Sequence, residues 1–296
     1  MNGQDLLAEG FESNRSHLRS VAYRMLGSLS EADDAIQEAW LRLSRTGSTD
    51  IDNLKAWLTT VVSRVCLDML RSRKSRREES LDASERVSVA LNEDVRTLED
   101  EAALADSVGL AVLVVLETLT PAERLALVLN DMFDVSFEEI ATIVGRSPMA
   151  ARQLVSRARR RVRGTDKISS ADLPKRRQVV DAFLAALRAG DFEGLLAVLD
   201  PDVMVRTDVS DRSGTPIEIR GAVNWAKTVI AFSRLARFVQ LVLINGSPGL
   251  VLAPRGQLSR AGSFKIVDNR IIEVEVIANP KRLRELELAL LPDSPE

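Results

Sequence analysis

Residues 147–163 read SPMAARQLVSRARRRVR and predict a single amphipathic helix. Ser147 is a suitable N-cap, and Pro148 is favoured in the first turn of a helix. Apolar residues recur at helical spacing and predict a buried stripe made of Ala151, Leu154, Val155, Ala158 and Val162. The opposite face is polar and carries Arg152, Gln153, Ser156, Arg157, Arg160 and Arg163.

Two helix starts are signalled upstream of this segment. Residues 136–139 (Ser-Phe-Glu-Glu) and 120–123 (Thr-Pro-Ala-Glu) each place a hydroxyl residue three positions before a glutamate, which is the pattern of a capping box. The apolar residues that follow Ser136 at helical spacing are Phe137, Ile140, Ala141 and Val144. Gly145 permits a tight turn before residue 147. A short helix, a glycine turn and a second helix together predict a helix-turn-helix.

The polar face of residues 147–163 indicates DNA contact. A recognition helix presents its amino-terminal residues to base edges in the major groove, so we expect Arg152 and Gln153 to read bases. We expect the arginines further along, Arg157, Arg160 and Arg163, to lie nearer the phosphates. Residues 146–163 contain seven arginines and no acidic residue. This composition favours DNA over the alternative, a merely solvated basic helix face.

Length and composition predict a multidomain protein. The chain has 296 residues and 45% hydrophobic residues, enough for two or three domains. Its net charge of -3 gives no hint of nucleic acid, so the local arginine clusters carry that signal. The one cysteine, Cys66, is expected in a core, and the absence of a basic-then-apolar leader predicts a cytoplasmic protein. The longest apolar stretch, residues 108–116, is about half of a membrane span, so no membrane anchor is expected.

The first hundred residues show helical periodicity in three segments. Gly27 is expected to end the first helix, Ser30 to cap the second, and residues 44–53 to separate the second from the third. Residues 82–106 are rich in Asp and Glu, which is typical of a flexible linker.

The last third of the chain has a different pattern. Helices are predicted over residues 175–189 and 223–235. Strands are predicted over residues 203–209, 238–245, 249–253, 263–267 and 271–277. Helices that interrupt a series of strands indicate an α+β domain with a curved antiparallel sheet.

Taken together, the segments of residues 6–164 resemble an extracytoplasmic-function (ECF) RNA polymerase sigma factor. Residues 30–40, SEADDAIQEAW, resemble the sigma helix that docks on the clamp helices of RNA polymerase. The resemblance assigns the exposed residues of this helix to binding of core RNA polymerase, namely Asp33, Asp34, Gln37 and Glu38. Acidic side chains there could meet basic side chains of the polymerase. Taken alone, an acidic helix face is merely solvated.

Residues 53–71 resemble the helix of this family that opens the minus-ten promoter element, and the resemblance assigns residues 147–163 to the minus-thirty-five element. In the family, the loop before the first of these helices captures an unstacked base, a role that residues 44–53 would take. The implied minus-ten contacts are Asn53, Lys55, Arg64, Arg71, Arg73 and Lys74. Trp57 could stack on a base, but its helical spacing with Leu54 favours a core role.

The second half resembles the cone-shaped SnoaL-like fold that is fused to the SigJ-like group of these sigma factors. Residues 279–283, NPKRL, resemble the group's Asn-Pro-Asp-Lys-Leu motif, and residues 210–214, SDRSG, stand where a glycine-rich motif is expected. The resemblance implies that this domain modulates sigma activity in cis. The candidate interdomain contacts are Asp211, Asn279, Pro280 and Leu283. The alternative reading is that they are ordinary loop and helix-cap residues.

The expected fold class is therefore multidomain, with two all-α sigma domains, the second carrying the helix-turn-helix, followed by an α+β cone-shaped SnoaL-like domain. The predicted boundaries are a region-two domain over residues 1–79, an acidic linker over 80–106, a region-four domain over 107–166 and a SnoaL-like domain over 172–296.

Two other functions compete with that of a sigma factor. The cone fold also hosts enzymes, but the one histidine, His17, lies in the first helix, and Asp208 and Asp211 lack an evident acid-base partner. We therefore expect no enzymatic activity, no cofactor and no metal, while a small apolar ligand touching Trp225 is left open. A conventional helix-turn-helix regulator with a ligand-binding or weakly enzymatic SnoaL-like domain would not need the polymerase-binding helix.

Overall fold

The computed structural model describes residues 3–46, 51, 53–79, 109–164, 172–210 and 216–291. This part of the chain divides into two compact units. The first contains residues 3–79 and 119–159, and the second contains residues 109–118 and 160–291. The predicted acidic linker, residues 80–106, and Asp211 lie outside the described residues.

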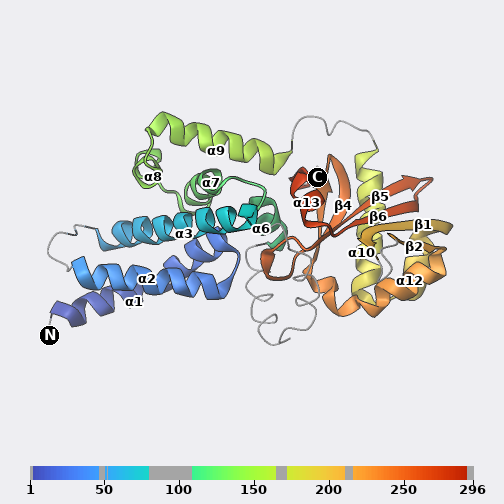
Figure 1. Cartoon of the computed structure of the whole chain (residues 1–296), viewed down its shortest axis with the longest axis horizontal. Coiled ribbons are helices and arrows are strands. Elements are labelled where there is room, and N and C mark those ends of the chain that lie inside the picture. Colours follow the sequence, from blue (N-terminus) through green and yellow to red (C-terminus); the bar gives the residue numbers. More distant parts are fainter. Residues whose placement is uncertain are drawn as a thin grey trace. The chain divides into compact units, whose positions relative to one another are not determined.

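The first unit is entirely helical (Figure 1). Its helices are α1 (Gly3–Leu26), α2 (Leu29–Thr46), α3 (Leu54–Glu79), α7 (Pro121–Phe133), α8 (Phe137–Val144) and most of α9 (Pro148–Arg163). As predicted, α1 ends before Gly27, which adopts a φ of 76°. The predicted cap at Ser30 is wrong, because α2 begins at Leu29 and the hydroxyl of Ser28 accepts from the amide of Glu31 at 3.5 Å.

The core of the first unit follows the predicted periodicity. The fully buried residues include Leu18, Val21, Ala22 and Met25 of α1, Ala35, Ile36, Ala39 and Leu43 of α2, and Leu58, Val62 and Cys66 of α3. Cys66 is a free thiol inside this core, as expected. Trp57 is half-buried, which leaves both of its predicted roles open. Residues 44–46, which were expected to separate the second helix from the third, belong to α2.

The second unit combines helices with one sheet. Its helical elements are α6 (Leu110–Leu116), the end of α9, α10 (Leu173–Ala189), α11 (Phe192–Val198), α12 (Ala222–Ala231), α13 (Pro280–Glu285) and the 3-10 helices η1 (Ser233–Phe238) and η2 (Pro254–Gly256). The helix predicted over residues 223–235 is therefore shorter than expected. It ends at Ala231, and the chain tightens into η1.

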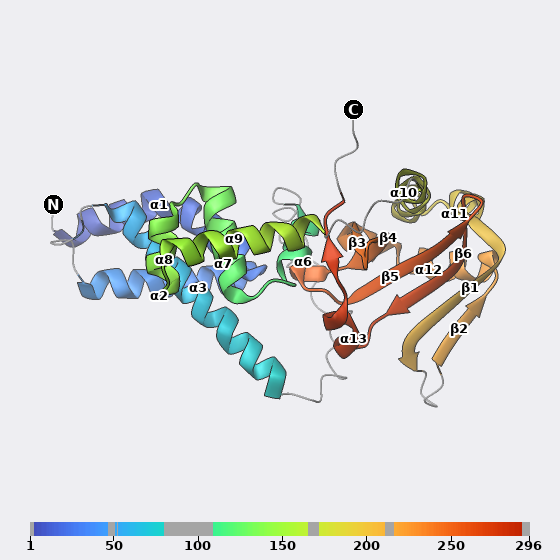
Figure 2. The same cartoon turned by 90° about the horizontal axis from the view of Figure 1, so that it is seen from above.

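The sheet has seven strands in the order β2-β1-β6-β5-β4-β3-β7 and is strongly curved (Figure 2). The strands are β1 (Leu199–Ser210), β2 (Pro216–Arg220), β3 (Val239–Ile244), β4 (Ser247–Leu252), β5 (Arg260–Val267), β6 (Arg270–Ile277) and β7 (Leu288–Ala289). The pairs are antiparallel except β1 with β6, which is parallel. A parallel pair needs a long crossover, and the elements from β2 to β5 supply it. The predicted α+β class is confirmed, but the prediction of an antiparallel sheet is wrong for the parallel pair of β1 and β6, which makes the sheet mixed.

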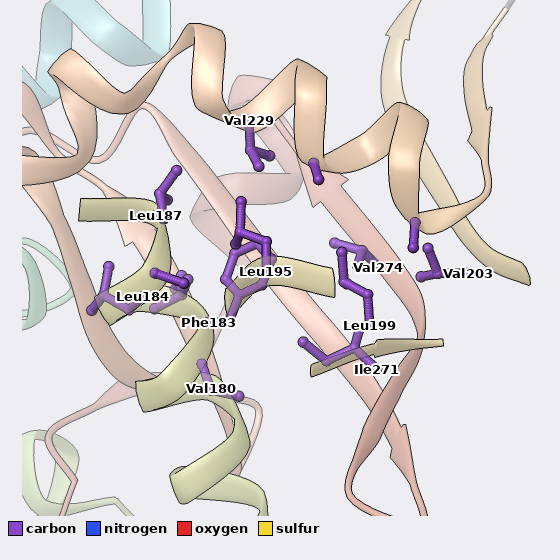
Figure 3. Packing of buried hydrophobic residues seen from close by; sticks show 14 of the residues in the cluster. Val180, Phe183, Leu184, Leu187, Leu195, Leu199, Val203, Val229, Ile271 and Val274 are labelled. Carbon is purple, nitrogen blue, oxygen red and sulfur yellow. The ribbon is translucent and has the colours of Figure 1, made fainter. Parts of the chain in front are cut away.

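The two faces of the sheet bury separate clusters. One face packs under α10, α11 and α12 (Figure 3). There Phe183 lies against Phe264, with ring centroids 5.6 Å apart. The opposite face packs against α6, whose Val114 and Val115 join a cluster with Val251 and Leu283. Because side chains alternate along a strand, neighbouring residues of β5 serve the two clusters in turn. No helix in the described ranges is long and apolar enough to cross a membrane.

Candidate nucleic-acid interface

The capping boxes predicted at both helix starts are present. Thr120 accepts from the amide of Glu123, and the Glu123 carboxylate accepts from the amide of Thr120. Ser136 and Glu139 repeat this exchange at α8. Gly145 ends α8 with a φ of 70°, and the hydroxyl of Ser147 accepts from the amide of Ala150 at 3.3 Å. These interactions between residues a few positions apart determine where α8 ends and where α7, α8 and α9 begin.

The helix α9 buries the predicted stripe and exposes the predicted face. Ala151, Leu154, Val155 and Ala158 are buried, while Val162 is only half-buried. The exposed set is Arg152, Gln153, Ser156, Arg157, Arg160 and Arg163. Arg152 makes a cation–π contact with Phe137, because its guanidinium carbon lies 5.1 Å from the centroid of that ring.

Arg159 is held by side chains of a neighbouring helix. Its guanidinium donates to both carboxylate oxygens of Asp131 on α7, the shortest contact being 2.6 Å, and to Asn130. Hydrogen bonding to Asp131 raises the pKa of Arg159 above its usual value. The side chain therefore anchors α9 to α7, and sequence periodicity alone does not reveal this role.

The face of α2 that the resemblance assigns to core polymerase is exposed. Asp33, Asp34 and Gln37 are exposed, and Glu38 is half-buried. Two of the carboxylates already hold arginines of the same unit, Arg19 with Asp33 and Arg42 with Glu38, each at 2.9 Å. Both pairs are largely solvated, so a partner can replace them at small cost.

A hollow that no sequence pattern predicts lies beside this acidic face. Its volume is about 350 Å³, and it is lined by residues of α1 and α2 that include Phe11, Trp40, Asp34 and Gln37. The rings of Phe11 and Trp40 pack with their centroids 5.1 Å apart. The acidic face therefore borders a concave surface with aromatic side chains, a feature that suits a protein partner.

The residues expected at the minus-ten element differ in their surroundings. Asn53 caps α3, since its side-chain oxygen accepts from the amide of Ala56 at 3.0 Å. Lys55, Arg64 and Arg71 are exposed. The position of the Lys74 side chain lies outside the described residues.

Arg73 and Arg64 make tertiary contacts within the first unit. Arg73 donates to the carboxylate of Glu31 and to the carbonyl of Leu26, and its side chain is only 15% exposed. This arrangement ties the end of α3 to the turn between α1 and α2. Arg64 donates to the carbonyl of Thr142 on α8 at 3.1 Å. A residue expected to face single-stranded DNA thus contacts the helix-turn-helix.

The candidate interdomain residues that the structure describes lie at the start of α13 or within it. Asn279 caps α13 by accepting from the amides of Lys281 and Arg282, and Pro280 occupies its first turn. Leu283 is buried in the cluster that contains α6. Asp208, considered above as a catalytic acid, accepts from the amides of Ala278 and Asn279. This carboxylate fixes the turn into α13 and does not line the apolar cavity on the other face of the sheet.

Comparison with known proteins identifies the family. The family model described as Sigma-70 region 2 matches residues 11–76, and the model described as Sigma-70, region 4 matches residues 109–162. The ECF RNA polymerase sigma factor SigJ of Mycobacterium tuberculosis is 36% identical over 286 residues, which cover 92% of this chain and 91% of that protein. This chain belongs to the ECF RNA polymerase sigma factors.

Further matches cover nearly the whole of this sigma factor. The probable ECF RNA polymerase sigma factor SigI of the same species is 32% identical over 291 residues, which cover 98% of this chain and 99% of that protein. The crystal structure of SigJ covers 93% of this sigma factor and 97% of its own chain, with 32% identity and a TM-score of 0.44.

Membership of this family establishes the general function of the chain in transcription initiation. Like other sigma factors, this chain binds core RNA polymerase and promoter DNA and directs the initiation of transcription. It is an initiation factor and not an enzyme. The region-2 match favours this function over the conventional helix-turn-helix regulator, which has no region 2.

Proposed function

We propose that the C-terminal SnoaL-like domain modulates the activity of this sigma factor in cis by holding both ends of region 4. The observation that carries the proposal is the cluster on one face of the sheet. Val114 and Val115 of α6, which belong to the region-4 match, pack there with Ile244, Val251 and Leu283 of the C-terminal domain. Burial of each such side chain stabilises the attachment by about 1.5–3 kcal/mol.

Two hydrogen bonds reinforce this attachment. The carboxylate of Glu117, directly after α6, accepts from the amide of Leu258 at 3.0 Å. At the other end of region 4, the carbonyl of Val162 accepts from the amide of Leu290 at 2.8 Å. Both ends of the region-4 segment thus bond to the C-terminal domain, which supports a role for that domain in positioning the helix-turn-helix.

The middle of region 4 packs elsewhere, against the helices of region 2. Arg64 of α3 bonds to Thr142 of α8, and α7 contacts both α1 and α3. The minus-ten and minus-thirty-five elements are about 25 base pairs apart, or roughly 85 Å of duplex. Helices in direct contact cannot reach both elements, so α8 and α9 must leave region 2 when the promoter is bound. We infer that the C-terminal domain controls this opening.

The individual contacts to polymerase and DNA are part of the proposal. Asp33, Asp34, Gln37 and Glu38 would bind core polymerase through exposed carboxylates and amide. Asn53, Lys55, Arg64, Arg71, Arg73 and Lys74 would bind the minus-ten strand, with Arg73 doing so only if it leaves Glu31. The exposed face of α9 would read the minus-thirty-five element. The protein would act in the cytoplasm, and the cone of the SnoaL-like domain would receive a small apolar ligand.

Reconstitution with core polymerase tests control in cis. Leu283→Ala removes a side chain from the cluster that holds α6, a change that typically costs 2–5 kcal/mol. We expect this variant to raise transcript yield from a fixed promoter, because region 4 leaves region 2 more easily. The matched control is Leu195→Ala, which removes the same atoms from the cluster on the opposite face of the sheet. Equal yields from both variants and the parent would contradict the proposal.

A further inference from the structure

The SnoaL-like domain contains an apolar cavity on the face of the sheet opposite α6. Its volume is about 160 Å³, and it lies between α10, α12, η1 and strands β3 to β6. Phe183 and Leu187 of α10 and Val229 of α12 point into the same interior (Figure 3). A cavity of roughly 150 Å³ with Leu, Ile and Phe walls is known to stay dry and bind benzene. The size therefore fits one six-membered ring.

Two polar side chains line this cavity, and both are hydrogen-bond donors. Trp225 contributes an indole whose Nε1 is buried and has no acceptor among the described residues. An unpaired buried donor is costly, and an acceptor supplied by a ligand would relieve that cost. The second donor is an arginine, and the remaining described residues of the lining are apolar or glycine. The lining therefore offers no side-chain acceptor.

That arginine is Arg260, at the start of β5. It is half-buried and makes no ion pair or hydrogen bond through its side chain with any described residue. Arg260, Gly262 and Phe264 alternate along β5 and share the face that lines the cavity. A guanidinium at the edge of an apolar cavity favours a carboxylate, because the two groups match in charge and in geometry.

We propose that this cavity binds a small aromatic carboxylic acid. The ring would fill the apolar interior, and the carboxylate would be the acceptor for Trp225 and Arg260. This inference rests on the proposed role of the cone as a ligand site and adds the chemical class of the ligand. An amine is disfavoured as the polar group, since a further donor beside Trp225 and Arg260 would find no acceptor among the side chains described around the cavity.

Gly262 offers a way to close the site without disturbing the donors. A Cβ added there would meet only Leu250 O at 3.8 Å and Phe264 Cζ at 3.9 Å, which is ordinary contact distance. A larger side chain at this position therefore projects into the cavity with little strain on the strand. Gly262→Leu is a blocking variant, and it leaves Trp225 and Arg260 in place.

The test measures binding of sodium benzoate and of toluene to the full-length protein by ligand-observed NMR and calorimetry. We expect benzoate to bind, and Arg260→Gln and Trp225→Phe each to weaken it by about tenfold or more. The affinity for toluene should be the same in Arg260→Gln as in the parent. Gly262→Leu should abolish binding of both probes. The matched control is Arg270→Gln, an exposed arginine on β6 outside the cavity. Circular dichroism of each variant verifies folding.

The outcomes separate this inference from the proposed function. Benzoate binding that is equal in the parent and in Arg260→Gln would overturn the carboxylate assignment, and binding unchanged in Gly262→Leu would overturn the site. Absence of benzoate binding to the folded parent overturns the inference as well. If benzoate binds as expected while Leu283→Ala leaves transcript yield unchanged, the ligand site stands and only control in cis fails.

Discussion

The guanidinium of Arg124 on α7 donates to the main-chain carbonyl of Arg24 at the end of α1, at 3.2 Å from Nη2 and 3.4 Å from Nε. One hundred residues separate the two partners, which lie in different sigma regions. Arg124 is only 3% exposed, so its charge is held inside the first unit. A buried charged donor stabilises a closed arrangement only while its acceptors stay in place.

Replacing Arg124 should therefore loosen region 4 from region 2. We expect Arg124→Met to lower the free energy of unfolding by about 2 kcal/mol, since a hydrogen bond to a charged group is lost. Urea unfolding followed by circular dichroism measures the change. The control is Arg64→Met, which removes an exposed arginine whose bond to Thr142 is solvated. It should change the free energy by about 0.5 kcal/mol or less, and equal effects of the two substitutions would argue against a special role for Arg124.

His17 should make the stability of the first unit depend on pH. Burial, and secondly the charge of Lys55, lower the pKa of His17 below its usual value of 6.5. The unfolded chain therefore binds a proton at a higher pH than the folded chain does. The contribution of His17 to the free energy of unfolding is fully present above about pH 6.5. It is lost as the pH falls toward the lower pKa that His17 has in the folded protein.

The chain has one histidine, so an NMR titration of its ring reports this pKa directly. The ring lies 3.2 Å from the hydroxyl of Thr59 and edge-on to Phe133. In His17→Phe, the part of the pH dependence of stability that arises between pH 7 and pH 5 should be reduced. A ring that titrates at or above pH 6.5, or a variant with the parent's full pH dependence, would refute this assignment.

Cys66 should resist thiol reagents in the folded protein. Burial raises the pKa of this thiol to about 12, so the reactive thiolate is scarce at pH 8. We expect Cys66 to react slowly with Ellman's reagent in buffer. In about 6 M guanidinium, a concentration that unfolds most domains, we expect the reaction to be stoichiometric. The control is Ser13→Cys, which adds an exposed thiol on α1 and should react at once. Fast labelling of the parent would show that the first unit opens readily.

The arginines of α9 should divide by their surroundings. On duplexes selected by the sigma factor bound to core polymerase, Arg157→Ala should reduce the salt dependence of binding by about one phosphate contact. Gln153→Ala should instead cost about 1–3 kcal/mol for the preferred base and keep the salt slope. Arg159→Ala is the matched control, because Asp131 holds that side chain. If it changes the salt slope as much as Arg157→Ala, the proposed division of roles is wrong.

Local signals predicted most of the secondary structure. The capping boxes at Thr120 and Ser136, the glycine turn at Gly145 and the buried stripe of α9 depend on residues a few positions apart, and each is present. The predicted cap at Ser30 failed because Ser28 is an equally good cap two residues earlier. The helix expected to reach Leu235 ended early for a tertiary reason, since η1 packs against α10 and the sheet.

The sequence by itself determined the helix-turn-helix, the alternation of strands and the exposed arginines, because periodicity and capping act within a few residues. Only the tertiary structure decided which of those residues have partners. Arg73 is held by Glu31 and Arg159 by Asp131, and Arg124 reaches a carbonyl one hundred residues away. The attachment of α6 to the sheet and the unpaired donor of Trp225 are also tertiary. Such contacts depend on how distant segments pack, which local pattern does not encode.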